Sequence, residues 1–178
     1  PIGTGNAYGL ETFFEKVTGK TLFSLNYSFS LSDRTFPNIN NGQTFPFGFN
    51  RDHNVKFSVT YRLSQFSEFL VNWSYSSGNY YSQPIGISVP ISGQPVFVYL
   101  EKNNATFPDF HRLDFGFSFY NVYKWGRAKF FLGLYNAYNR NNPFYSELVR
   151  TNNNTGKYEL RNYSLLPLLP TISYSISF

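Results

Sequence analysis

The sequence of 178 residues contains no cysteine, and only 14% of its residues are charged. Without cysteine the chain has no disulfide, no thiol nucleophile and no thiolate metal site, and its redox compartment is left open. Soluble domains carry about 25% charged residues, so the low charge argues against an ordinary soluble domain. No apolar stretch approaches the roughly 18 residues of a transmembrane helix, which excludes such helices but not transmembrane strands.

Runs of like charge and a recognisable leader are also missing. The net charge of +5 is modest, and Lys and Arg never cluster, which argues against a nucleic-acid partner. The chain starts with "PIGTGNAYGLE", without methionine or a signal peptide. We therefore expect a mature or processed fragment of a longer gene product.

Aromatic residues are abundant: 21 Phe, 15 Tyr and 2 Trp make up 21% of the chain. Its polarity comes largely from Ser, Asn and Thr, and many hydrophobic residues occupy alternate positions. In the last eight residues, "TISYSISF", hydroxylated and apolar side chains alternate without a break. Such alternation fits a sheet with one face toward lipid and the other toward water.

The same period of two recurs along the chain and predicts strands. The range 128–138 is apolar on both faces near its start, so its register stays open. Strands are predicted near residues 7–17, 21–32, 54–63, 68–77, 112–121, 128–138 and 171–178.

The connections between these strands are strongly unequal. Short turns alternate with long loops near 33–52, 79–111 and 140–170, and apolar patches such as Val96–Leu100 predict hairpins within the second and third loops. Short periplasmic turns and long extracellular loops are typical of outer-membrane barrels. We therefore predict an all-β fold, a transmembrane antiparallel β-barrel, with residues 1–178 as part of one barrel domain. Seven strands are an odd set, and an unpaired edge is costly in lipid, so we expect a larger barrel.

Five stretches of the chain carry a family resemblance: "AYGLETFFEK", "FPNINNGQTFPFGFNRDHN", "PDFHRLDFGFSF", "GLYNAYNRNNPF" and "LLPLLPTISYSISF". Together they resemble the C-terminal end of Bacteroidetes-type TonB-dependent outer-membrane transporters. The resemblance implies a barrel of 22 strands, of which these are the last seven, with a plug domain and a TonB-contacting segment in an N-terminal region not present here. It also implies that terminal Phe178 is the signal by which the barrel-assembly machinery recognises the chain.

Three sets of residues are candidates for a role in a barrel of this kind. If Phe57, Phe115 and Ile172 face lipid, a set of charged side chains faces the lumen: Glu11, Glu15, Lys56, Arg62, Arg112 and Asp114. Loop aromatics are candidates for ligand or partner contacts, with packing of the loops against one another as the alternative: Phe45, Phe47, Tyr80, Tyr81, Phe144 and Tyr145. A third set of aromatics near strand ends should form interfacial girdles: Tyr61, Trp73, Tyr75, Tyr123, Trp125 and Phe178.

The chain offers little sign of catalysis or metal binding. The only two histidines, His53 and His111, stand where long loops meet strands, and their separation has no ligand-spacing signature. Nucleophile-elbow, P-loop and dinucleotide motifs are absent. We expect no enzymatic activity, no metal and no cofactor.

We expect energised, TonB-dependent uptake of a bulky scarce nutrient, such as a siderophore, haem, a peptide or a cofactor, across the bacterial outer membrane, with a periplasmic C-terminus. The alternatives are a receptor-like barrel serving as a structural subunit of a larger envelope complex, and a passive porin. The expected partners are outer-membrane lipid and lipopolysaccharide, TonB, the barrel-assembly machinery and, for some such receptors, a surface lipoprotein or larger envelope complex.

Overall fold

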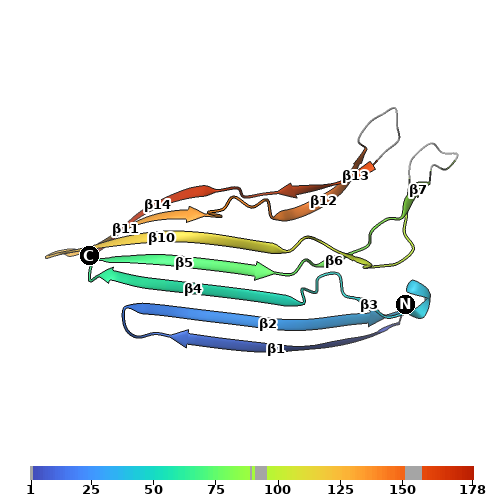
Figure 1. The fold of residues 1–178 in the computed structure, drawn as a ribbon, viewed down its shortest axis with the longest axis horizontal. Helices are drawn as coiled ribbons and strands as arrows, with labels where there is room; N and C mark the ends of the chain where they lie inside the picture. The colour runs from blue at the N-terminus through green and yellow to red at the C-terminus, as the bar shows by residue number, and fades with distance from the viewer. Residues whose placement is uncertain (1, 89, 91–95, 151–157) are drawn as a thin grey trace. The chain divides into compact units, whose positions relative to one another are not determined.

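The computed structural model of the chain describes residues 2–88, 90, 96–150 and 158–178. Its regular structure is all-β, apart from one 3-10 turn at Asn40–Gly42 (Figure 1). No described segment is a helix long and apolar enough to cross a membrane. Contacts divide the chain into two compact units, residues 1–12, 28–54 and 76–108, and residues 13–27, 55–75 and 109–178.

Seven long strands form the main sheet, in the order β1-β2-β4-β5-β10-β11-β14. The predicted all-β, antiparallel class is thereby confirmed. The described strands β1 and β14 are the two ends of this order and are not paired with each other. The seven strands are β1 (Thr4–Lys16), β2 (Thr21–Thr35), β4 (His53–Ser64), β5 (Ser67–Ser76), β10 (Phe110–Tyr123), β11 (Gly126–Tyr135) and β14 (Leu169–Ser177).

Shorter strands lie within the long connections. Strand β3 (Phe45–Pro46) pairs with β2, and the remaining short strands form three two-stranded sheets. The connection from β11 to β14 contains the hairpin of β12 (Pro143–Arg150) and β13 (Tyr158–Ser164). The connection from β5 to β10 contains β6 (Tyr80–Tyr81) paired with β9 (Ala105–Thr106), and β7 (Gly86–Ser88) paired with β8 (Val96–Val98).

The register of β10, β11 and β14 separates two faces. Ser118 pairs with Phe131, which pairs with Ser173, and one residue along, Phe119 pairs with Phe130, which pairs with Tyr174. Because side chains alternate along a strand, these two rows point to opposite sides of the sheet. We call the side of Ser118 and Ser173 the polar face and the side of Phe119 and Tyr174 the apolar face.

This register settles the position of the strand whose faces were ambiguous in the sequence. Phe130 lies on the apolar face, and Phe131 lies on the polar face between Ser118 and Ser173. The strand ends at Tyr135, three residues before the predicted 138, because Asn136 has a φ of 53°. Such left-handed backbone is tolerated by Asn and stops a strand.

Phe131 belongs on the polar face because two glycines make room for its ring. Gly116 and Gly133 are directly paired on β10 and β11. A Cβ atom added at Gly116 would lie 2.6 Å from Cε2 of Phe131, and one at Gly133 would lie 2.7 Å from Cε1 of the same ring. The aromatic ring therefore covers backbone that has no side chains of its own, a known way of stabilising glycines in a sheet.

Little of the sheet is covered by other parts of the chain. Among the described hydrophobic residues only Phe45 and Ala128 are buried. On the apolar face, large side chains are exposed on successive strands. Within β14 the most exposed of them is Ile172, with 73% of its surface accessible. Large exposed apolar surfaces are typical of sites that interact with proteins or membranes.

We predict that Gly116→Ala destabilises the fold through the ring of Phe131. The added methyl group collides with the ring, and overpacking of this kind costs about 1–3 kcal/mol. The double variant Gly116→Ala/Phe131→Ala should lose much of that collision. Its loss of stability should therefore be smaller than the sum of the losses in the two single variants. Thermal unfolding followed by circular dichroism measures both. Additive losses of stability would contradict the proposed contact.

Candidate functional site

All six predicted lumen-facing charges lie on strands of the main sheet, and three of them meet. Lys56 on β4 and Arg112 and Asp114 on β10 line one hollow, together with hydroxyl and amide side chains of β2, β4 and β5. The other charges lie elsewhere. Arg62 lines a hollow with Glu68, Glu15 lines one with Lys16, and Glu11 is exposed on β1.

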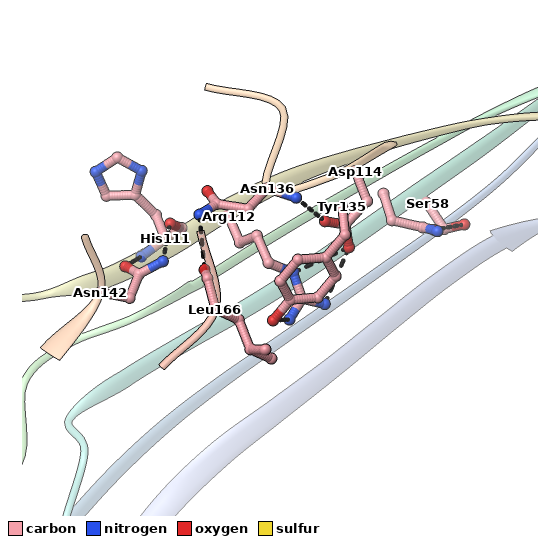
Figure 2. Close-up of polar contacts among 9 residues, drawn as sticks. Ser58, His111, Arg112, Asp114, Tyr135, Asn136, Asn142 and Leu166 are labelled. Carbon is pink, nitrogen blue, oxygen red and sulfur yellow. Dashed lines mark hydrogen bonds and ion pairs between the residues drawn. The ribbon is translucent and has the colours of Figure 1, made fainter. Parts of the chain in front are cut away.

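Arg112 is held in place from several sides (Figure 2). Its Nη2 lies 2.9 Å from Oδ2 of Asp114, and its Nε donates to the same oxygen at 3.0 Å. Its Nη1 donates to the hydroxyl of Tyr135 at 2.6 Å, and the guanidinium lies 4.1 Å from the centre of that ring. A planar guanidinium bound in this way has a fixed orientation before any ligand arrives.

Asp114 also connects the strand to the loop that follows β11. Its Oδ1 accepts a hydrogen bond of 2.9 Å from the backbone N–H of Asn136. Asn136 is 0% exposed, and its amide donates to the carbonyls of Arg140 and Leu166 at 2.9 and 3.1 Å. Its Oδ1 accepts from the backbone N–H of Arg140 at 3.1 Å. The buried side chain is thus fully paired, as a buried amide must be to be tolerated.

The same loop is tied back to the start of β10. Asn142 and His111 exchange two hydrogen bonds: the backbone N–H of His111 donates to Oδ1 at 3.1 Å, and Nδ2 donates to the His111 carbonyl at 3.0 Å (Figure 2). Arg140 donates to the carbonyl of Asp109 at 2.9 Å. These contacts order the loop base and the first residues of β10 together.

The two histidines have structural contacts. Nδ1 of His111 lies 2.7 Å from the hydroxyl of Tyr138, and the ring of His53 lies 5.4 Å from that of Phe29. Neither belongs to a group of three or more metal-binding side chains among the residues that the structure describes.

The loop aromatics differ in what they expose. Phe45 is 4% exposed and lies 6.2 Å from the ring of Phe36, so it packs the loop and has no face for a ligand. Phe47 lies under the guanidinium of Arg34, at 4.4 Å, and Tyr81 stacks on Phe107 at 4.4 Å. Phe144 is exposed, and the side chain of Tyr145 lies outside those that the structure describes.

Tyr80 is the loop aromatic with the clearest polar role. Its hydroxyl donates to Oδ2 of Asp52 at 2.8 Å, and Asn50 donates to Oδ1 of the same carboxylate at 2.7 Å. Burial, the hydrogen bond and the nearby negative charge raise the pKa of Tyr80 to about 12. Tyr80 therefore stays a neutral donor at neutral pH and orders the loop around Asp52.

The arrangement around Asn136 could not be anticipated from strand periodicity. Its only local signal is the density of asparagine in "NAYNRNN", where Asn136 and Asn139 both have a φ of 53°. Asn139 accepts a hydrogen bond of 2.9 Å from the backbone N–H of Leu168. Both asparagines therefore hold the end of the long loop where it enters β14.

We predict that Asn136→Ala destabilises the protein by about 3 kcal/mol, because it leaves buried backbone groups without partners and places Ala at positive φ. Asn136→Gly should be milder, since glycine accepts this backbone conformation. Chemical unfolding and the rate of proteolysis within residues 136–168 measure the effect. The matched control is Asn121→Ala, at an exposed position. Equal stability of the Asn136 and Asn121 variants would contradict the proposed role.

Comparisons with known proteins add no assignment to this geometry. No family model, no curated protein and no solved structure matches the chain. The function therefore has to follow from the residues and the faces described above.

Proposed function

We propose that this chain forms part of the wall of a β-barrel in the bacterial outer membrane, and that the barrel takes up a bulky scarce nutrient by TonB-dependent transport. The observation that carries the proposal is the division of the antiparallel sheet into a polar face and an exposed apolar face. Ile172, Tyr174 and Ile176 are all exposed on β14, while Ser173 and Ser175 alternate with them. Lipid on one side and water on the other would stabilise both sets.

Strand length and aromatic placement support a membrane location. The seven long strands have between 9 and 15 residues, and a tilted strand needs about 9–11 residues to cross a bilayer. Tyr123, Trp125 and Phe178 cluster where β10, β11 and β14 meet, with ring centres 4.9 and 6.2 Å apart. Exposed aromatic rings at strand ends suit the boundary between lipid and water.

The placement of charges supports the same interpretation. Lys56, Arg112 and Asp114 share the polar face with serines and asparagines. Charged side chains on the lipid face would cost about 2–4 kcal/mol each for Lys and Arg near the bilayer midplane. On the opposite face they are hydrated and able to contact a polar solute that passes through the barrel.

The step from a barrel to TonB-dependent uptake rests on the sequence resemblance, which favours a barrel of 22 strands containing a plug. The well-ordered loop bases, at Asp52 and Asn136, fit a receptor whose loops receive a ligand. A structural subunit of a larger envelope complex is the second candidate, because the hairpin of β7 and β8 exposes Val96 and Val98 to a partner. A passive porin is the third.

We predict an alternating pattern of reagent accessibility in β14. The chain has no cysteine, so single cysteines can be introduced without a background. Each introduced cysteine is labelled with a fluorophore. Spin labels attached to lipid should quench a fluorophore at position 172 or 174, where Ile172 and Tyr174 are replaced, but not one at position 171 or 173, where Thr171 and Ser173 are replaced. Fluorescence of the reconstituted protein measures the quenching. Equal quenching at neighbouring positions would exclude a strand between lipid and water.

We also predict that uptake depends on the proton motive force. Cells with and without the protein are given radiolabelled haem, cobalamin or a ferric siderophore, and accumulation is compared before and after a protonophore. Protein-dependent accumulation that stops with the protonophore supports TonB-dependent transport. Accumulation that persists supports a porin. Accumulation that is the same in cells with and without the protein, together with stoichiometric partner proteins that co-purify with it, supports a structural subunit.

A further inference from the structure

A hollow on the main sheet contains Lys56. It has a volume of about 390 Å³ and draws its lining from β2, β4, β5 and β10. We call it the Lys56 hollow. The lining residues used below are Ser24, Asn26, Lys56, Ser74, Arg112 and Asp114.

The one carboxylate of the hollow is already committed. Oδ2 of Asp114 binds Arg112, and Oδ1 accepts from the backbone of Asn136. A carboxylate whose two oxygens are engaged has little capacity left for a further cation or donor. The acid therefore serves the fold and the orientation of Arg112.

The two cations are in the opposite situation. Arg112 donates hydrogen bonds to Asp114 and Tyr135. Because a guanidinium has five N–H donors, some of them have no partner in these contacts. Lys56 is exposed, and within the part of the chain that the structure describes its ammonium has no ion pair or hydrogen bond. The hollow thus combines an oriented guanidinium with an exposed ammonium.

Neutral polar groups, with Phe57 and Trp73, complete the lining. Ser24, Asn26 and Ser74 make no hydrogen bonds through their side chains to other described residues, whereas Ser58 donates to Asn72 at 2.6 Å. These hydroxyl and amide groups can donate to or accept from the hydroxyls of a hydrophilic molecule. The hollow offers two cations against one committed carboxylate, so a cationic molecule would be repelled.

We propose that the Lys56 hollow binds a carboxylate or phosphate group of a hydroxyl-bearing ligand. This inference rests on the proposed function, because the polar face is where a transported solute would pass, and it specifies the chemical class of that solute as anionic and hydrophilic. Arg112 offers the oxyanion a preoriented donor, and Lys56 closes over it from β4. The neighbouring serines and asparagines receive the hydroxyl groups.

Binding is tested with citrate and inorganic phosphate by isothermal titration calorimetry on the full protein in detergent micelles. Lys56→Gln should weaken binding of these anions about tenfold, since a charge-assisted hydrogen bond contributes on the order of a factor of ten. Lys56→Arg keeps the charge and should retain most of the affinity. The matched control is Lys124→Gln, which removes the same charge in the turn between β10 and β11 and should leave binding unchanged. Raffinose, a neutral hydroxylated solute, and spermidine, a cation, should bind poorly.

Three results would overturn the inference: no binding of either anion to the wild type, equal affinity of wild type and Lys56→Gln, or equal weakening by Lys124→Gln. A failure of this inference can be distinguished from a failure of the proposed function. The quenching experiment on β14 tests whether the strand lies between lipid and water, and it needs no ligand. Lipid quenching in the alternating pattern together with absent anion binding would reject only the ligand class. Quenching that does not alternate along β14 would reject the proposal that the sheet is part of a barrel wall.

Discussion

The register in which β10, β11 and β14 pair is the constraint on which the rest of the structure depends. Because side chains alternate along a strand, a slip of one residue would move the serines of β14 to the side of Phe119 and Phe130. The pair of Gly116 and Gly133 opposes such a slip, since the ring of Phe131 occupies the space that a Cβ atom at either position would need. One aromatic ring and two residues without side chains thereby help to define which face is polar.

The polar contacts of the loops extend from this register. Asp114 and Tyr135 come one residue beyond the pair of Phe115 and Leu134, so both stand at the edge where the strands separate. There Asp114 binds Arg112 on its own strand and the backbone of Asn136, the first residue after β11. A single carboxylate therefore joins the orientation of a cation on the sheet to the shape of the loop that leads to β14.

Periodicity in the sequence predicted the seven long strands and their two faces because alternation depends only on neighbouring residues. It did not assign Phe130 and Phe131, since both are apolar and only the glycines of paired strands distinguish them. Nor did it find the contacts of Asn136, whose partners lie at Asp114, Arg140 and Leu166. Phe45 was one of the candidates for ligand or partner contact or for loop packing. It is buried and packs against Phe36, and burial depends on distant segments that a local pattern does not contain.

The different states of acids and bases on the polar face bear on how such a wall would handle a solute. Asp114 and Glu68 are both engaged, the latter accepting from Tyr120 and lying 3.9 Å from Lys129, whereas Lys56 is exposed on the same face. Conduction through any pore requires contacts strong enough for entry and weak enough for release. The exposed ammonium of Lys56, beside Arg112, hydroxyls and amides, meets that requirement better than a closed cluster of paired charges. If this sheet is part of such a wall, as proposed, an anion could contact Lys56 without displacing an ion pair among the described residues.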